Sequence, residues 1–348
     1  MDEVKLFVPG RIGIIGEISD LVSPYLSQNS ELIPGHAITV KIDKGIYSKA
    51  RISDKFKYKN KNQIFECEVS EDRLKKEAES NSFFSYMCGT ILYLIKNYEV
   101  AGIEIEIEKM DLPVKKGLSS SAAICMTIAK AYNKLYDLQL KDNEIKNIAY
   151  QGEHLAQSQC GKLDQESISN NAISHIIFEK DNVKSEEIFV KKDVYILVVD
   201  LNRNKNTKSI MTCFNSALPF AQNENDKIIH DIIGEKNKKL VERAIEGLKD
   251  GDLPKLGETL NKAQKLMDKA AVLCSELEAP FFHELLNDSY VKESIYGGKS
   301  SGSGGDGTAV LICKNQQKQQ ELSKYIENKY EMKPIEFCIE KTKGVEVI

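Results

Sequence analysis

The stretch Gly117-Leu-Ser-Ser-Ser-Ala122 decides the fold of this chain. It lies between an alternating run at residues 103–107, which predicts a strand, and an apolar run at residues 122–136, which predicts a helix. Glycine lets backbone amides approach a ligand closely, and serine is preferred where a helix begins. The free N–H groups and partial positive charge of a helix start favour phosphate. A serine-rich helix cap without a ligand would explain the same residues, so this stretch alone leaves both interpretations open.

A second glycine-rich stretch, Tyr296-Gly-Gly-Lys-Ser-Ser-Gly-Ser-Gly-Gly-Asp-Gly-Thr308, lies near the C-terminus. Its glycines permit positive φ angles and close contact between the backbone and a ligand. A flexible linker has a similar composition, but this stretch lies between a predicted helix and a predicted strand, which favours an ordered loop. Glu293 stands where a P-loop requires its first glycine, so the sequence excludes a P-loop ATPase.

Two further loops carry charged residues. Val8-Pro-Gly-Arg-Ile-Gly-Ile-Ile-Gly-Glu-Ile-Ser-Asp20 places Arg11, Glu17 and Asp20 on one compact segment, which a strand and a turn with solvated charges would also explain. Ser158-Gln-Cys-Gly-Lys-Leu-Asp-Gln165 offers Asp164, a carboxylate that could accept a proton from a substrate hydroxyl. A lone aspartate in a loop is more often a turn residue.

Composition sets the broad class of the protein. The chain has 348 residues, of which 41% are apolar and 29% charged, as in an ordinary globular protein of two domains. The net charge of −4 gives no general attraction to nucleic acid, so no nucleic-acid partner is expected. No signal peptide, membrane span or Cys-x-x-Cys pair is visible, and eight scattered cysteines favour a cytoplasmic, reducing environment without a membrane partner.

Hydrophobic periodicity predicts strands and helices in alternation, without an internal repeat. Predicted strands cover residues 4–8, 37–42, 46–52, 63–69, 102–108, 172–178, 194–200, 308–313 and 334–340. Predicted helices cover residues 71–97, 122–136, 142–157, 226–249, 253–273 and 315–329. The chain becomes polar and turn-rich after Asp200, so the sequence predicts two α+β domains with a boundary around residues 180–200.

Taken in order, these stretches resemble the signature set of the GHMP kinases, a superfamily that includes galactokinase, homoserine kinase, mevalonate kinase and phosphomevalonate kinase. Residues 9–17 resemble the first motif, residues 113–122 the second, and Gly302-Ser-Gly-Gly305 with its flanks the third. The resemblance spans nearly the whole chain. It implies an α+β, two-domain fold: a ribosomal protein S5 domain 2-like ATP-binding domain at residues 1–190 and a ferredoxin-like α/β domain at residues 191–348.

The resemblance also implies a role for each matched residue. ATP is the implied co-substrate, and its phosphates would lie against Pro113, Gly117, Leu118, Ser119, Ser120, Ser121 and Ala122. Ser121 and Glu153 would hold Mg²⁺. Asp164 would act as the catalytic base, or would only orient the hydroxyl, and Arg11 would lie beside it and stabilise the transferring phosphoryl group. The acceptor would contact Glu17, Asp20, Gly161, Gly302, Ser303 and Gly304.

The form of the fourth stretch bears on the acceptor. Cys160-Gly-Lys-Leu-Asp-Gln165 is similar to the Cys-Gly-x-Met-Asp-Gln of galactokinase, which implies a sugar kinase that acts on the anomeric hydroxyl and forms a sugar 1-phosphate. Ile18 and Leu21 replace a histidine and a tyrosine of galactokinase, so a uronic acid, a pentose or a heptose stays open beside galactose.

Other functions stay open as well. A mevalonate or phosphomevalonate kinase shares the fold, and a non-catalytic sensor of nucleotide or sugar would need neither base nor metal ligands. Oligomeric state is not legible. A charged acceptor would need a cation, for which the candidates are Arg51, Arg203, Lys205 and Lys208. His36 could reach a substrate, although a packed role is favoured for it and for His175, and the histidines show no metal-ligand spacing.

Overall fold

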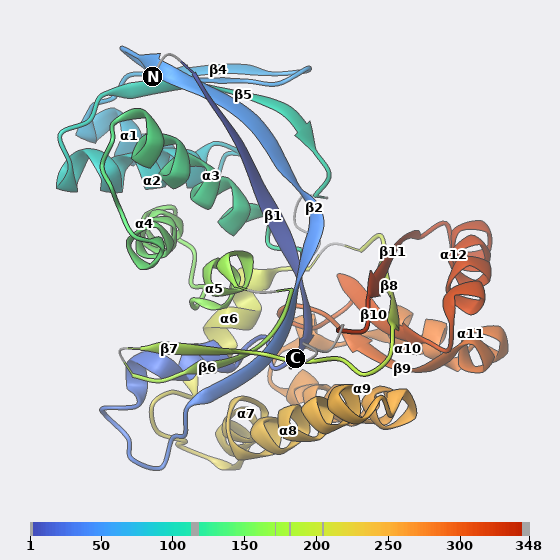
Figure 1. Ribbon diagram of the computed structural model, residues 1–348. Coiled ribbons are helices and arrows are strands. Elements are labelled where there is room, and N and C mark those ends of the chain that lie inside the picture. Colours follow the sequence, from blue (N-terminus) through green and yellow to red (C-terminus); the bar gives the residue numbers. More distant parts are fainter. Residues whose placement is uncertain (1–2, 113–117, 171, 181, 204, 343–348) are drawn as a thin grey trace, which may run out of the picture. The chain divides into compact units, whose positions relative to one another are not determined.

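The computed structural model describes residues 3–112, 118–170, 172–180, 182–203 and 205–342 (Figure 1). The chain packs as two compact units, each made of two separate pieces of sequence. Unit 1 is Met1–Arg11 with Lys41–Asn170, and unit 2 is Ile12–Val40 with Asn171–Ile348. Both units combine helices with strands, which confirms the predicted α+β class.

Two long strands explain why the units interleave along the sequence. β1 (Val4–Ile15) begins in unit 1 and ends in unit 2, and β2 (Gly35–Ser53) runs from unit 2 into unit 1. The predicted strands 37–42 and 46–52 are thus one strand. The predicted division at residues 190 and 191 follows chain order instead, and the assignment of family domains to residues 1–190 and 191–348 stays a prediction.

Unit 1 is a sheet with helices packed on one face (Figure 1). The second half of β2 pairs antiparallel with β5, with Ala50 opposite Ile105. The further elements of this unit are β3 (Phe56–Lys59), β4 (Ile64–Cys67), α1 (Glu71–Ala78), α2 (Ser85–Asn97), β5 (Gly102–Met110), α3 (Ser120–Leu135), α4 (Asp142–Leu155) and α5 (Leu163–Ser169).

Helices α2 and α4 meet at two glycines. A Cβ on Gly89 would lie 2.3 Å from the carbonyl oxygen of Gly152, and a Cβ on Gly152 would lie 2.2 Å from the Thr90 hydroxyl oxygen. Only glycine lets the two backbones approach this closely. The contact fixes the position of the next residue along α4, Glu153, which is buried.

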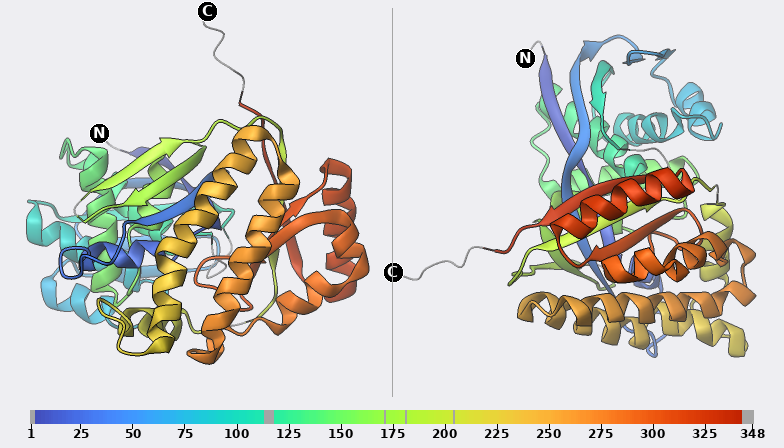
Figure 2. Two further views of the ribbon diagram at one scale, coloured as in Figure 1. Left: turned by 90° about the horizontal axis from the view of Figure 1, so that it is seen from below. Right: turned by 90° about the vertical axis from the view of Figure 1, so that its right-hand side faces the viewer.

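Unit 2 combines the first half of β2 with a four-stranded antiparallel sheet in the order β11-β8-β10-β9. Leu322 and Ile326 of α12 pack on apolar side chains of this sheet (Figure 2). The strands of this unit are β6 (Ile173–Phe178), β7 (Val183–Glu187), β8 (Val194–Asp200), β9 (Ile295–Ser300), β10 (Thr308–Cys313) and β11 (Lys333–Ile339). Its α-helices are α6 (Thr207–Ser216), α7 (Glu224–Ile233), α8 (Glu235–Asp250), α9 (Leu253–Asp268), α10 (Pro280–Asn287), α11 (Ser289–Ser294) and α12 (Gln316–Tyr330). Its 3-10 helices are η1 (Ser19–Tyr25), η2 (Lys269–Val272) and η3 (Ser275–Leu277).

Two predicted helices are each divided in the structure. The prediction for residues 71–97 missed a break between α1 and α2, where Asn81 has a φ of 56°. The prediction for residues 226–249 missed the break between α7 and α8 at Gly234. Neither break contains a proline, and the apolar spacing continues across both, so periodicity alone predicts one helix in each case.

No helix in the described part of the chain is both long enough and apolar enough to cross a membrane.

Candidate active site

The serine-rich loop of unit 1 ends at the start of α3, as the sequence predicts. Ser119 is the N-cap residue and has a left-handed backbone, with φ 61° and ψ 36°. Its side chain makes no capping bond, and its buried hydroxyl has no hydrogen-bond partner among the described atoms. Helix α3 therefore begins without a side-chain cap and beside an unused Ser119 hydroxyl, and the start of a helix is a suitable place for an anion. Pro113 and Gly117 lie outside the described residues, whereas Leu118, Ser120 and Ala122 are described.

Ser121 and Glu153 are in contact. The Ser121 hydroxyl donates to the Glu153 carboxylate, as do the Cys160 thiol, at 3.6 Å, and the Gln165 side-chain amide. Glu153 is only 2% exposed. Burial and, to a smaller extent, the charge of Asp164 raise the pKa of Glu153 to about 7, even though the three donors oppose the shift. One hydroxyl and one carboxylate are oxygen ligands of the kind that Mg²⁺ takes in proteins.

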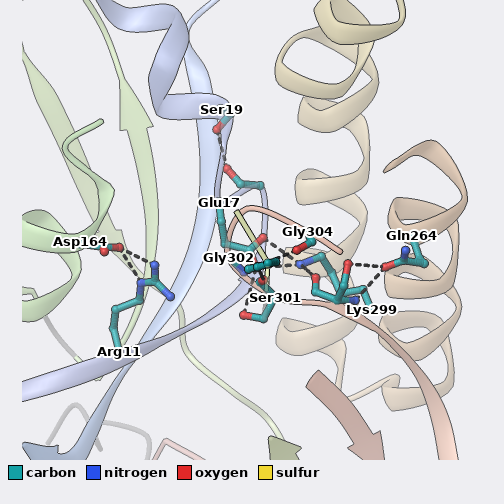
Figure 3. A network of polar contacts seen from close by, with 12 residues as sticks. Arg11, Glu17, Ser19, Asp164, Gln264, Lys299, Ser301, Gly302 and Gly304 are labelled. Atoms are coloured by element: carbon teal, nitrogen blue, oxygen red, sulfur yellow. Dashed lines mark hydrogen bonds and ion pairs between the residues drawn. The ribbon is translucent and has the colours of Figure 1, made fainter. Parts of the chain in front are cut away.

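Arg11 and Asp164 form an ion pair in unit 1 (Figure 3). Arg11 lies on β1 and is 4% exposed, and its Nε donates to Asp164 Oδ1 at 2.9 Å, while Nη2 contacts the same oxygen. Asp164 is in the first turn of α5, and its side chain is 23% exposed. Gly10 lets β1 lie close to the segment before α3, because a Cβ there would lie 2.8 Å from the Leu118 carbonyl oxygen. The structure thus pairs two residues that the sequence separates by 153 positions.

Glu17 and Lys299 form a second ion pair, in unit 2 (Figure 3). The Lys299 ammonium donates to Glu17 Oε1 at 2.7 Å and to Oε2 at 3.0 Å, and it also donates to the Ser300 carbonyl oxygen at 2.6 Å. Both side chains are buried, at 3% and 7% exposed. Gly302 donates its backbone N–H to Glu17 Oε1 at 3.2 Å, so this pair touches the second glycine-rich stretch.

That glycine-rich stretch leaves β9 and returns to β10. Gly302, Gly304 and Gly305 have φ angles of 66°, 91° and 69°, in the left-handed region that favours glycine. The Lys205 ammonium donates to the Gly304 carbonyl oxygen at 2.6 Å, which holds the turn to the segment before α6. Asp306 caps α10, because its carboxylate accepts the backbone N–H groups of that helix's first turn. The Ser303 hydroxyl is buried and has no partner among the described atoms.

The two remaining predicted acceptor residues lie in different units. Asp20 is buried in η1 of unit 2, and Gly161 is partly exposed in the loop before α5 of unit 1. Each unit therefore gathers part of the predicted site. Unit 1 brings together Arg11, Ser121, Glu153 and Asp164, and unit 2 brings together Glu17 and Gly302.

Comparison with known proteins shows which family part of the chain matches. Residues 85–169 match the family model described as the GHMP kinases N terminal domain. The galactokinase of Thermosipho africanus is 24% identical, over 94% of this chain and 94% of its own length. Residues 85–169 therefore carry a GHMP kinase N-terminal domain. The protein is a phosphotransferase, and the kinase family of that domain implies ATP as its co-substrate.

Solved structures show the same fold. The Lactococcus lactis galactokinase complexed with galactose has a TM-score of 0.74 to this protein at 18% identity, covering 98% of this chain and 94% of that one. The Methanococcus jannaschii mevalonate kinase has a TM-score of 0.73 at 22% identity, covering 98% and 99%. The predicted two-domain α+β GHMP fold is confirmed. Because the two scores are so close, the fold does not separate a sugar acceptor from mevalonate.

The sequence did not predict three polar residues that contact the candidate site. Gln165 is 1% exposed and binds Glu153, Lys299 pairs with Glu17, and Gln264 of α9 accepts from Ser300 through its Oε1 atom. Gln165 and Lys299 stand inside stretches already singled out, next to Asp164 and between Gly298 and Ser300. Their position beside predicted site residues was the available signal. No sequence signal pointed to Gln264, because nothing in the local pattern of α9 distinguishes this residue.

Three of the four cations considered for a charged acceptor have contacts of their own. Arg51 pairs with Glu104 at 2.8 Å, Arg203 lies 3.7 Å above the ring of Phe281, and Lys205 donates to turn carbonyls. Lys208, the fourth, is exposed on α6.

The two histidines for which a packed role was favoured bond to each other. His36 Nδ1 lies 3.0 Å from His175 Nε2, and both side chains are buried. Burial and the neighbouring His175 lower the pKa of His36 to about 4.

Proposed function

We propose that this protein phosphorylates the anomeric hydroxyl of a neutral sugar, with Mg·ATP as donor, to give a sugar 1-phosphate and ADP. The observation that carries the proposal is the Arg11–Asp164 pair of unit 1, since Asp164 in turn lies close enough to Glu153 to raise its pKa. A base, a cation and metal-ligand oxygens are the parts that phosphoryl transfer requires.

The proposed reaction uses these groups in a single displacement. The acceptor oxygen forms a bond to the γ-phosphorus, while the bond from that phosphorus to the oxygen bridging the β-phosphate breaks, and ADP leaves with that oxygen. The proton of the acceptor hydroxyl passes to the Asp164 carboxylate. The Arg11 guanidinium holds this carboxylate and stabilises charge on the transferring group.

Ser121 and Glu153 are proposed to hold the magnesium ion of Mg·ATP. Their oxygen atoms suit a hard cation, and Mg²⁺ commonly takes one or two protein ligands with phosphates and water. The described residues contain no group of three or more His, Cys, Asp or Glu side chains that could hold a metal by themselves. This fits a cation that arrives with its nucleotide, whose charge it neutralises. The phosphates are proposed to lie at the start of α3, against residues 113–122.

Two observations favour a neutral sugar as acceptor. Relatives that cover nearly the whole chain, such as the Thermosipho africanus enzyme, are named galactokinases. Arg51, Arg203 and Lys205 each already hold a protein group, so a carboxylate on the acceptor would compete with existing contacts. Asp20 and the turn at residues 302–304 are proposed to contact the hydroxyl groups, since carboxylate and carbonyl oxygens accept hydrogen bonds from a polyol.

The test measures ADP release from Mg·ATP with a panel of free hexoses, pentoses, heptoses, uronic acids and mevalonate. A neutral sugar should stimulate turnover, and Asp164→Asn should lower kcat about 10²- to 10⁴-fold, the usual contribution of a general base. Asp72→Asn is the matched control, because Asp72 is also in the first turn of a helix but is exposed. A response to mevalonate alone would refute the sugar acceptor, and full activity of Asp164→Asn would refute the role of Asp164.

A further inference from the structure

The oxygen atoms of the Glu17 carboxylate accept several hydrogen bonds from groups of the same unit. Its Oε1 atom accepts from the Lys299 ammonium at 2.7 Å, from the backbone N–H of Gly302 at 3.2 Å and, at a longer 3.5 Å, from the Ser301 hydroxyl. Its Oε2 atom accepts from Lys299 at 3.0 Å. An ionised carboxylate has about four acceptor positions, so these contacts use most of them.

Displacing these contacts would be costly. Lys299 is 7% exposed in its side chain, so a sugar hydroxyl that took its place on Glu17 would leave a cation buried without its partner. Breaking one side of a buried ion pair is more destabilising than one hydroxyl–carboxylate hydrogen bond is stabilising. Glu17 is therefore poorly suited to bind the acceptor directly.

The local backbone is adapted to this position of Glu17. A Cβ on Gly13 would lie 2.2 Å from Glu17 Cγ and 2.7 Å from Oε1, so the side chain of Glu17 folds back over Gly13. Gly13 has no left-handed φ angle, and alanine could adopt its backbone. A side chain at residue 13 would therefore act mainly by moving Glu17 away from Lys299.

On its other side, the pair continues into a buried polar network (Figure 3). Lys299 donates to the Ser300 carbonyl oxygen, and Ser300 donates both its N–H, at 2.7 Å, and its hydroxyl, at 2.9 Å, to Gln264 Oε1. Gln264 Nε2 then donates to Asp268 Oδ1 at 2.8 Å. The glycine-rich turn is thus held at its start from two directions, by the end of β1 and by α9.

We propose that Glu17 and Lys299 are a pair of positioning residues that fix the glycine-rich turn of residues 300–305 for the phosphoryl acceptor, and that Glu17 is not itself an acceptor ligand. This inference rests on the proposed function, in which that turn contacts the acceptor. It changes the role expected for Glu17 from the sequence motif. The charge of Glu17 is used within the protein, by Lys299 and the backbone of Gly302.

The test compares Glu17→Gln, Lys299→Met and the double variant in three measurements. These are melting temperature, amide hydrogen exchange at residues 300–305, and the KM of the panel sugar that gives the highest turnover, with galactose as the first probe. Each single variant should melt lower, exchange at least tenfold faster at the turn and raise the sugar KM about tenfold, with kcat less affected. The double variant contains no unpaired buried charge. Its exchange rate at the turn and its sugar KM should return to within about threefold of wild type, and its melting temperature to within a few degrees.

Gly13→Ala should break the contact between Glu17 and Lys299 in a different way, by displacing the Glu17 side chain. It removes no polar group, and it should reproduce the faster exchange at residues 300–305 and the raised sugar KM by displacing Glu17. Glu246→Gln is the matched control, because it breaks an exposed ion pair of unit 2, with Lys255, and should change neither measurement.

The outcomes separate positioning from direct binding. If the double variant recovers melting temperature and exchange while its sugar KM stays as poor as that of Glu17→Gln, Glu17 is an acceptor ligand and the proposal is wrong. Unchanged exchange at the turn in both single variants would also overturn it. If wild type phosphorylates no sugar in the panel, the proposed function fails, but the exchange and melting measurements still decide whether the pair fixes the turn.

Discussion

At the scale of single residues, the surroundings of Glu153 have opposing effects on its pKa. Burial and the charge of Asp164 favour its protonated form, whereas the donors Ser121, Cys160 and Gln165 favour the carboxylate. The resulting pKa of about 7 lies well above the ordinary glutamate value of 4.5. Glu153 is proposed as a metal ligand, and with this pKa its carboxyl becomes charged near neutral pH. A bound cation would favour the ionised form.

This residue gives a signed prediction for stability without metal. Because the folded pKa is raised, folding favours the protonated carboxyl, so stability is highest below pH 4.5 and falls as pH rises to about 7. A shift of this size corresponds to about 3 kcal/mol. Glu153→Gln should remove this part of the pH dependence, measured by urea unfolding at pH 5 and pH 8 with EDTA present. Equal pH dependence in both proteins would contradict the prediction.

At the scale of elements, α9 and β9 touch through their backbones. A Cβ on Gly257 of α9 would lie 2.4 Å from the Tyr296 carbonyl carbon, and a Cβ on Gly297 of β9 would lie 2.1 Å from the Gly257 carbonyl oxygen. These are backbone atoms, which cannot move aside like the end of a flexible side chain. The same helix carries Gln264, so the packing of α9 determines where Ser300 is held.

Replacing Gly257 should therefore lower the stability of the protein and displace the glycine-rich turn of residues 300–305. Gly257→Ala is expected to destabilise the protein by about 1–3 kcal/mol through overpacking, although alanine favours helix by itself. It should also raise the KM of the sugar while leaving the KM of ATP nearly unchanged. Lys265→Ala, at an exposed position of the same helix, is the control. The measurements are chemical unfolding and steady-state kinetics, and a more stable Gly257→Ala protein would refute this packing argument.

The sequence predicted elements well where local periodicity decides them. Helix α3 and the strands β5 and β8 lie where their apolar patterns place them. β9 was not predicted, because Gly297 and Gly298 resemble a loop, and the strand forms only through pairing with β10. Among site residues, the Arg11–Asp164 contact was expected from the motif resemblance. The Glu17–Lys299 contact was not, since it joins residues 282 positions apart and no local pattern encodes such a pairing.

At the scale of the whole molecule, the proposed nucleotide site predicts a ligand effect on unfolding. Mg·ATP at one hundred times its Kd should raise the free energy of unfolding by about 2.7 kcal/mol. Asp164→Asn should keep this effect, because Asp164 is proposed to act on the acceptor. AMP, which lacks the β- and γ-phosphates proposed to lie with the α-phosphate at the start of α3, should stabilise much less at the same concentration. Thermal unfolding with each nucleotide measures this stabilisation in wild type and in Asp164→Asn. Equal stabilisation by AMP and Mg·ATP would argue against the phosphate site.

The long strand β2 also sets an order of events during synthesis. Its first half, Gly35–Val40, pairs with residues 173–178, and its second half pairs with β5 at residues 102–110. Residues 41–170 must therefore leave the ribosome before the first half meets β6. At about 5–20 residues per second, an apolar strand edge waits on the order of ten seconds for its partner. During that interval the unpaired edge can pair with a wrong strand. Because the two units are interleaved along the sequence, the N-terminal strand must wait for its partner before it can fold.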